Sequence, residues 1–275
     1  QAAELEPDSA KVPYQLGRAY FLQRNYKGAI AQFARSRQLD GTRVKALYRI
    51  GGCQMELGDF KAAAKIYSDI AKEHPDGPAA SVRPFDAART GLALAEGAAV
   101  LILESEEWAR ERGATPLGEI VGYGASSDAF NLTQPSREGQ VRAMRAALAD
   151  AGLPPEAVGY INAHATATQV GDVVEVQAIK EALGAHARRI PVSATKSMHG
   201  HLVGAAGALE LGITLMAVAQ GRVPPTANLT DPDPECDLDF VPGRGREAPG
   251  LEYALSNTFG FGGSNVSLVV RRIAD

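Results

Sequence analysis

Three side chains able to take part in polar chemistry lie in the second half of the sequence, each next to the end of a predicted element. His164 ends an apolar segment in NAHATATQVGD (Asn162–Asp172). Lys196 and His201 precede a helix rich in glycine and alanine in SATKSMHGHLVGAAGALE (Ser193–Glu210). A neutral imidazole has one hydrogen-bond donor and one acceptor, so a partner must fix which nitrogen carries the proton. Because α/β folds build sites where their elements end, we expect these three side chains and the turn at Phe261 to surround one point.

A glycine-rich turn and an opening loop accompany them. The turn SNTFGFGGSN (Ser256–Asn265) contains Phe261, Gly262 and Gly263, and its many glycines indicate a close approach of the backbone. The loop RPFDAARTGLALAEGAAVLILE (Arg83–Glu104) opens the same part of the chain. Taken one at a time, these features have structural explanations, since a glycine cluster is usually a turn and a single histidine at a strand end is usually a packing residue.

Neither cysteine is placed as a nucleophile. Cys53 falls at a packing position of a predicted helix. Cys236 lies in a loop rich in proline and aspartate, with no helix N-terminus or base following it to lower the pKa of the thiol. His199 and His201 form a His-x-His pair, but no cysteine or carboxylate at ligand spacing accompanies them, so we expect no metal and no cofactor.

Apolar segments alternate with helical patterns around these loops. The predicted strands are Gly97–Leu103, Leu117–Tyr123, Val158–Asn162, Ile190–Ala194, Tyr253–Asn257 and Asn265–Arg271, and the predicted helices are Gly139–Ala151, Val173–Leu183 and Gly204–Ala219. Such alternation implies a layered α/β domain, which we place at residues 78–275. The connector PDGPAASVRP, which has no helical period, separates it from the preceding segment.

Residues 1–77 repeat themselves. Gly17 recurs as Gly51 and Ala29 as Ala63, each 34 residues later. This period resembles the tetratricopeptide repeat, a pair of antiparallel helices, and predicts an α-helical repeat segment. Small residues at these positions let helices approach closely, and Leu16 would help to fill the seam between them. An ordinary pair of helical hairpins with accidental self-similarity is the alternative.

The order of the motifs in residues 78–275 resembles one family. His164, then Lys-x-x-x-Gly-His over Lys196–His201, then Gly-Phe-Gly-Gly over 260–263, are similar to the condensing enzymes, and more narrowly to β-ketoacyl-acyl carrier protein synthases of type II. The resemblance extends from about residue 83 to residue 273. It implies a thiolase-like fold of two similar halves, of which this chain holds only the C-terminal half. His199 departs from the family, which usually has threonine there.

The resemblance implies a role for each matching residue. His164 and His201 would donate N–H groups to the thioester oxygen of a malonyl group as carbon dioxide leaves. Lys196 would join them in a polar network with Glu210. The backbone N–H of Phe261 would form one arm of an oxyanion hole, in the same turn as the two glycines that follow it. The family's nucleophilic cysteine belongs to the half that is absent here.

Charge and hydropathy exclude several classes of protein. A net charge of -4 argues against nucleic acid as a partner, because phosphate-binding proteins concentrate lysine and arginine. No apolar run is expected to cross a bilayer, and the N-terminus has no signal pattern. Two cysteines form no disulfide framework, so the cytoplasm is the expected location. Because the chain begins with Gln1, we expect a piece of a longer polypeptide or a processed product.

We therefore expect an acyltransferase that condenses malonyl and acyl thioesters of acyl carrier protein in fatty-acid or polyketide synthesis, provided that an N-terminal half is supplied. For this chain alone we expect no condensation. A tetratricopeptide module that binds a peptide or protein in its groove, joined to an inactive synthase remnant, is the alternative. A truncated or misassembled fusion is the third reading, and oligomerisation stays open.

Overall fold

The chain forms two compact units, Gln1–Gly77 and Pro78–Asp275. The computed structural model describes residues 9–39, 43–57, 59, 62, 65, 66 and 82–273. Among these residues each unit has a hydrophobic core of its own, with one cluster in the first unit and two in the second. Within the described residues, the chemistry-bearing loops all belong to the second unit.

The first unit is helical. Its helices α2 (Lys11–Leu22), α3 (Tyr26–Gln38) and α4 (Arg43–Glu56) pack in succession, α2 on α3 and α3 on α4. Phe33 is fully buried against α2 at Gly17, where a Cβ atom would lie 2.7 Å from the Phe33 ring. The glycine therefore permits the close approach that its position in the repeat predicts. Leu16 is exposed instead of filling the seam, and Ala63 of the second predicted unit lies outside the described residues.

The second unit is built on a mixed five-stranded sheet with the order β1-β7-β6-β2-β3. Its strands are β1 (Glu119–Ser127), β2 (Val158–Asn162), β3 (Val192–Ser193), β6 (Tyr253–Gly260) and β7 (Ser264–Arg271). Strand β7 is antiparallel to both of its neighbours, whereas β2 is parallel to β6 and to β3. A separate two-stranded sheet pairs β4 (Arg222–Val223) with β5 (Arg246–Glu247).

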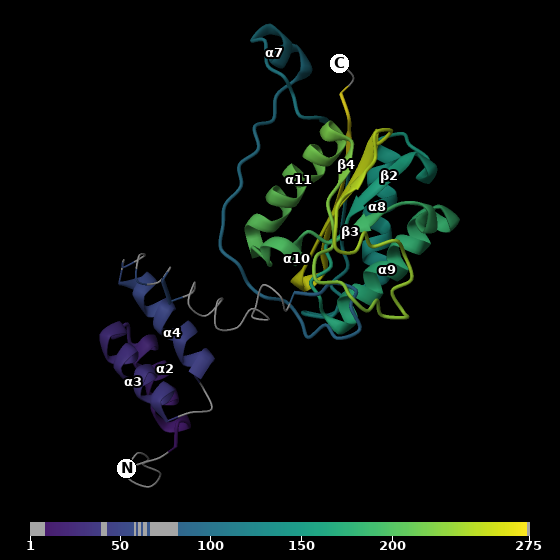
Figure 1. The fold of residues 1–275 in the computed structure, drawn as a ribbon. Helices are drawn as coiled ribbons and strands as arrows, with labels where there is room; N and C mark the ends of the chain where they lie inside the picture. The colour runs from purple at the N-terminus through teal and green to yellow at the C-terminus, as the bar shows by residue number, and fades with distance from the viewer. Residues whose placement is uncertain are drawn as a thin grey trace. The chain divides into compact units, whose positions relative to one another are not determined.

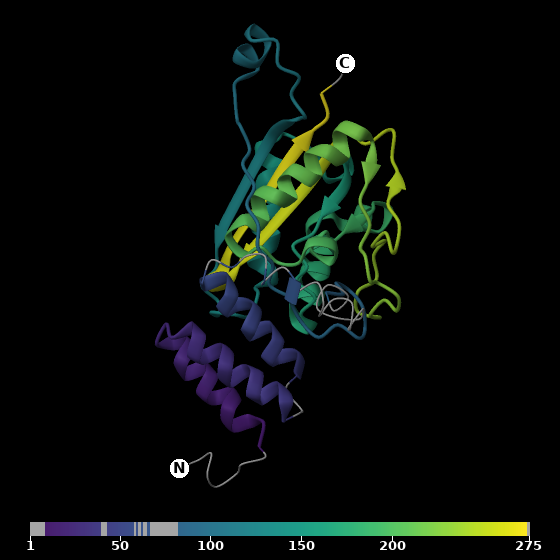
Figure 2. The same cartoon turned by 60° about the vertical axis from the view of Figure 1, so that its left-hand side comes forward.

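Helices cover both faces of this sheet. Helices α8 (Arg137–Asp150) and α9 (Gln169–Leu183) lie on one face and α11 (Ala206–Gln220) on the other (Figures 1 and 2). The shorter elements are α7 (Glu106–Glu111), α10 (Lys196–His199), η1 (Pro155–Ala157), η2 (Gly184–Arg189), η3 (Val203–Ala205) and η4 (Phe261–Gly263). The second unit therefore has the layered α/β arrangement predicted from the alternation of strands and helices.

Side-chain caps and glycines set the helix ends. Helix α9 begins earlier than predicted because the Thr168 hydroxyl accepts the backbone N–H of Gly171 at 3.2 Å and caps its first turn. Ser136 caps α8 in the same manner. Helix α11 ends at Gly221, whose φ of 60° is in the left-handed region that glycine adopts at helix C-termini.

The prediction of a strand over Gly97–Leu103 is wrong. In the structure this segment has no regular secondary structure and pairs with no strand among the described residues. Most of its large apolar side chains are in solvent, with Val100 88%, Ile102 80% and Leu103 73% exposed, whereas Leu101 packs partly buried against the core. A β-strand forms where a neighbouring backbone satisfies its N–H and C=O groups, and apolar composition alone does not provide that neighbour.

The expectation that no segment could cross a bilayer also needs correction. Val203–Gln220 is long enough and, with a mean hydropathy of 1.5, apolar enough to do so by length and composition. In the structure this stretch includes α11, which packs on β6 and β7 and carries the buried carboxylate of Glu210. The apolar character of the helix is therefore also explained by its place against the sheet.

Candidate active site

His201 is held in one tautomer by its own turn. The backbone N–H of Val203 lies 3.2 Å from Nδ1 of His201. Because an amide N–H can only donate, Nδ1 is the acceptor and the ring proton resides on Nε2. His201 therefore presents an N–H donor on the side of the ring opposite its own backbone contact.

A strap, residues 93–95 of the opening loop, forms backbone hydrogen bonds with His201 and holds it in place. The His201 N–H donates to the carbonyl of Ala93 at 2.8 Å, and the Ala95 N–H donates to the carbonyl of His201 at 3.0 Å. Gly200 precedes His201 with a φ of 73°, and a Cβ atom there would lie 2.8 Å from Cβ of Ala95. The strap is anchored by the buried Arg89, whose guanidinium donates to the carboxylate of Asp233 at 2.6 Å. These contacts leave the His201 backbone little freedom.

His164 follows β2 and lies beside His201. The two ring centroids are 5.5 Å apart, with an angle of 84° between the ring planes. The buried carboxylate of Glu175, on α9, accepts the backbone N–H groups of His164 at 2.9 Å and of Ala165 at 2.7 Å. Nδ1 of His164 is buried and has no hydrogen-bond partner among the described residues. Two imidazoles from distant parts of the chain therefore meet, each on a backbone fixed by hydrogen bonds.

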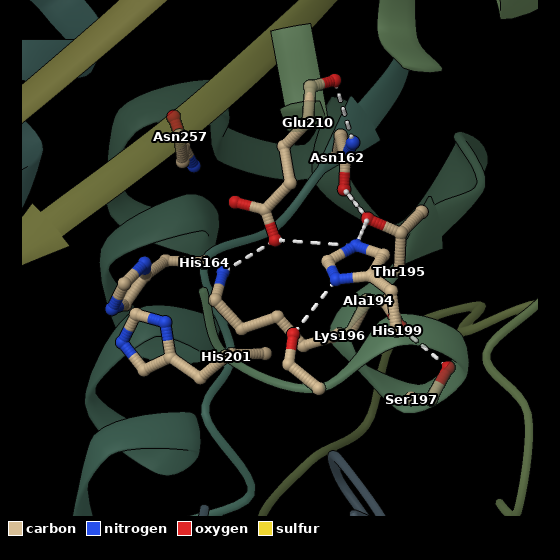
Figure 3. A network of polar contacts seen from close by, with 12 residues as sticks. Asn162, His164, Ala194, Thr195, Lys196, Ser197, His199, His201, Glu210 and Asn257 are labelled. Carbon is tan, nitrogen blue, oxygen red and sulfur yellow. Dashed lines mark hydrogen bonds and ion pairs between the residues drawn. The ribbon is translucent and has the colours of Figure 1, made fainter. Parts of the chain in front are cut away.

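Lys196 and Glu210 form a buried ion pair behind the two rings (Figure 3). Nζ of Lys196 lies 2.5 Å from Oε1 of Glu210, and both side chains are almost completely shielded from solvent. Burial raises the pKa of Glu210 to about 7, and the charge of Lys196 opposes that rise. The carbonyl of Glu210 accepts Nδ2 of Asn162, which ties α11 to the end of β2.

The surroundings keep both imidazoles neutral. Burial lowers the pKa of His164 well below its ordinary value, with the charge of Lys196 as the next cause. Burial and the same lysine lower the pKa of His201 to about 4. At neutral pH each ring therefore has one N–H and no net charge. Such a pair can donate hydrogen bonds to an oxygen that gains negative charge during a reaction.

The two histidines open onto a cavity of about 870 Å³. Its wall also includes Glu175, Phe259 and the turn at Phe261, so the loop after β2, α9, β6 and η4 all contribute to it. Phe261 is 72% exposed at the mouth. The exposed surface of the wall is mostly apolar, with polar side chains among the lining residues, which is typical of a site for a small organic ligand.

The glycine turn has structural reasons for its composition. The N–H of Gly262 donates to the carbonyl of Leu132 at 2.9 Å. Gly263 has a φ of 84°, and a Cβ atom there would lie 2.4 Å from the Asp128 carboxylate. The turn is therefore pressed against the loop that follows β1, as its glycines predict.

The structure brings together most of the residues singled out in the sequence. His164, His201, Phe261 and Gly263 line the cavity, while Lys196 lies behind the histidines next to Glu210. Glu175 was missed as a member of the site. The sequence feature that could have revealed it is its place in the predicted helix Val173–Leu183, at a position that the helical pattern buries. A carboxylate buried there without a partner would be costly.

Neither cysteine is among the residues that form this arrangement. Cys236 is buried, and burial raises the pKa of its thiol to about 12. Cys53 is buried in the core of the first unit. Neither thiol belongs to the wall of the cavity.

Two family models match the chain in separate regions. Residues 117–230 match the family described as β-ketoacyl synthase, C-terminal domain. Residues 20–82 match a tetratricopeptide repeat family. The first match includes both histidines, Lys196 and Glu210.

Several proteins are similar to this chain over its C-terminal part. The 3-oxoacyl-[acyl-carrier-protein] synthase 2 of Synechocystis sp. is 53% identical over 224 residues, which are 81% of this chain and 54% of that protein. Nodulation protein E of Rhizobium sp. is 52% identical over 70% of this chain and 47% of that protein. The chain therefore spans about half the length of these relatives.

Solved structures are likewise similar to this chain over about half of their own length. A β-ketoacyl synthase from Burkholderia phymatum matches with a TM-score of 0.69 and 46% identity, over 73% of this chain and 48% of that one. A second structure, described as a type II polyketide acyl carrier protein in complex with its ketosynthase, matches with a TM-score of 0.69 and 36% identity, over 81% and 54% of the two chains.

Proposed function

We propose that residues 78–275 supply the hydrogen-bond donors for decarboxylation in a 3-oxoacyl-acyl carrier protein synthase. The premise is that residues 117–230 match the C-terminal domain of the β-ketoacyl synthases. A second half, in the same polypeptide or on another chain, supplies the nucleophilic cysteine. The observation that carries this proposal is the pair of neutral imidazoles, 5.5 Å apart, at the wall of one cavity.

The proposed step is the loss of carbon dioxide from a malonyl thioester. The bond between the carboxylate carbon and the α-carbon breaks, and its electron pair forms an enolate whose charge rests on the thioester oxygen. Nε2–H of His201 and the N–H of His164 donate to that oxygen. The donors are already oriented, so little reorganisation is needed as charge develops. The enolate carbon then attacks an acyl thioester on the second half and displaces the cysteine thiolate.

Lys196 acts in this scheme through the histidines. Its charge, together with burial, favours the neutral form of both rings, which is the form with one donor and one acceptor. Glu210 balances the lysine within the protein. Glu175 fixes the backbone of His164 and thereby the direction of its ring.

The cavity provides the remaining interactions. The backbone N–H of Phe261 is proposed as one arm of an oxyanion hole for the acyl thioester, with its ring at the entrance to an apolar acyl site. The thioesters are proposed to arrive on acyl carrier protein, as in the similar ketosynthase complex. Buried thiols at Cys53 and Cys236 suit a reducing cytoplasm.

Residues 1–77 favour a second, binding function. A tetratricopeptide family matches residues 20–82, most of which belong to this segment, and the described helices pack in succession around Phe33. We propose that they form a helical repeat whose groove takes a peptide or protein. This function is compatible with the first, because the two units have separate cores.

The test measures both partial reactions on the purified chain. Carbon dioxide release is followed from malonyl-acyl carrier protein, and 3-oxoacyl product from malonyl- and acyl-acyl carrier protein together. We expect no condensation product and at most slow carbon dioxide release, because an open site holds the thioester poorly. His201→Ala should abolish the release, whereas His186→Ala, which changes a histidine outside the cavity, should not.

The same assay is repeated with the N-terminal half of the Synechocystis relative added as a separate chain. Appearance of 3-oxoacyl product that depends on His201 would support a split synthase. Robust condensation by the chain alone would overturn the proposal, since it would require a nucleophile in residues 1–275. Measurable carbon dioxide release that is equal in the wild type and His201→Ala, or 3-oxoacyl product that forms equally with both when the second half is added, would overturn the role of the imidazole pair.

A further inference from the structure

His199 is a half-buried residue whose imidazole the proposed reaction does not use. It is the last residue of α10, and 18% of its side chain is exposed. Its Nδ1 lies 2.7 Å from the carbonyl oxygen of Gly200, and its Nε2 lies 3.2 Å from the hydroxyl of Thr195 (Figure 3). Nε2 is also 4.0 Å from the Glu210 carboxylate. The ring is thus fixed at both nitrogens within the network behind His201.

The hydrogen-bond partners assign the ring proton. A carbonyl oxygen can only accept, so Nδ1 of His199 carries the hydrogen of the 2.7 Å bond to Gly200. Burial lowers the pKa of His199, so the neutral form prevails at neutral pH and Nε2 is an acceptor. The Thr195 hydroxyl also lies 3.3 Å from Oδ1 of Asn162, a second acceptor for its single proton. His199 therefore donates its one ring hydrogen bond through Nδ1, to the carbonyl of Gly200.

That bond acts on the peptide group that leads into His201. The carbonyl of Gly200 and the N–H of His201 belong to one planar peptide unit. The carbonyl accepts from His199, and the N–H donates to Ala93 at 2.8 Å. With both polar groups of the plane held, its rotation is blocked. Since φ of Gly200 is 73°, where glycine has wide freedom, this restraint matters at this position.

We propose that His199 is a positioning residue for His201. Its Nδ1–H fixes the Gly200–His201 peptide plane, and the plane fixes the direction in which the His201 ring meets His164. The inference rests on the proposed function only in that His201 is taken as the donor. The contact to Thr195 through Nε2 serves to orient the His199 ring.

Matched substitutions separate the two ring nitrogens. His199→Asn retains an N–H donor near the position of Nδ1, His199→Gln retains one near Nε2, and His199→Leu is close in shape to asparagine but has no donor. The histidine ring signals of each full-length variant are recorded by ¹H–¹³C NMR across a pH titration, with His201→Ala used for assignment. Thermal unfolding of each variant is measured beside it.

The charge of His199 is one cause of the low His201 pKa, so every substitution should raise that pKa slightly. Beyond this shared rise, we expect His199→Asn to leave the His201 ring signals and pKa close to those of the wild type. In His199→Leu and His199→Gln the freed turn should expose the His201 ring, so its signals shift and its pKa rises from about 4 toward its ordinary 6.5. Unchanged His201 signals in His199→Leu, or equal changes in the asparagine and leucine variants, would overturn the proposal even if the unfolding temperature falls.

These outcomes are independent of the reaction. If the carbon dioxide assay shows no dependence on His201 while the NMR pattern appears as expected, the positioning stands and the proposed function fails. If release depends on His201 but His199→Leu leaves both the NMR signals and the release unchanged, the function stands and the positioning role of His199 fails.

Discussion

Nζ of Lys196 lies 2.5 Å from Oε1 of Glu210, with the two side chains 0% and 1% exposed. The lysine precedes the turn to His201, and the glutamate belongs to the apolar helix α11. Burying either charge alone would be costly, so each residue compensates the buried charge of the other. Glu210 also has one carboxylate oxygen without a hydrogen-bond partner among the described residues. The pair is therefore balanced in charge but incompletely hydrogen-bonded.

Breaking this pair should destabilise the protein more than replacing it. We expect Lys196→Met to lower the free energy of unfolding by about 3 kcal/mol, because it leaves a buried acid without its partner. Lys196→Met/Glu210→Gln should recover part of that loss. Urea unfolding of both variants measures the difference. A double variant less stable than the single one would contradict this account of the pair.

The pH dependence of the Lys196→Met variant follows from the same contact. Burial raises the folded-state pKa of Glu210 above its unfolded value, and without Lys196 nothing opposes that rise. A carboxyl group whose pKa is higher in the folded state stabilises the fold below its unfolded-state pKa of 4.5. That stabilisation is lost as the pH rises from there through the folded-state pKa. The deficit of Lys196→Met should thus be larger at pH 8 than at pH 5. The Glu210→Gln double variant, which cannot titrate there, should lack this trend.

The two cavity histidines should resist protonation. Both have folded-state pKa values below the ordinary 6.5, that of His201 being about 4. Protonation therefore favours the unfolded chain, and the stability of the α/β unit should fall as the pH is lowered from about 6.5 to 4. NMR titration of the ring signals checks the pKa values directly. An ordinary pKa near 6.5 for His201 would contradict the neutral donor pair.

Much of the α/β unit could be predicted from the sequence because its elements carry local signals. The predicted helix over Gly139–Ala151 is α8, and the predicted strand over Val158–Asn162 is β2. Gly97–Leu103 failed because a strand also needs a neighbour, which no local pattern can specify. In the site, His164 and His201 were singled out by the order of motifs that resembles the condensing enzymes, and their places at element ends predicted that they would lie close together. The role of Glu175 was not, because it depends on the fold bringing its carboxylate to a distant backbone.

Close packing of β1 on α8 leads to a prediction about a glycine that the sequence did not single out. A Cβ atom at Gly124 would lie 2.0 Å from the carbonyl oxygen of Ala143 and 2.4 Å from the amide nitrogen of Ala147. Because these are backbone atoms of a helix, Gly124→Ala must separate the helix from the strand. We expect a loss of about 2 kcal/mol or more, measured by urea unfolding.

Gly204→Ala is the matched control for Gly124→Ala. A Cβ atom at Gly204 meets nothing within 4 Å, and its φ is outside the left-handed region. The change should leave stability the same within about 0.5 kcal/mol or raise it slightly, because alanine restricts the unfolded chain. Equal losses in the two variants would show that the strand and helix are not packed through Gly124.

The buried thiol of Cys236 should be unreactive. Its pKa of about 12 leaves about one thiolate in ten thousand at pH 8, and the thiolate is the form that attacks an electrophile. We expect iodoacetamide at pH 8 to leave Cys236 of the folded chain unmodified over a period in which the chain unfolded in urea reacts fully, as followed by mass spectrometry of peptides. An acyl thioester donor should likewise leave no acyl group on this residue. Rapid alkylation or acylation of Cys236 in the folded chain would give residues 78–275 a nucleophile of their own and remove the need for a second half.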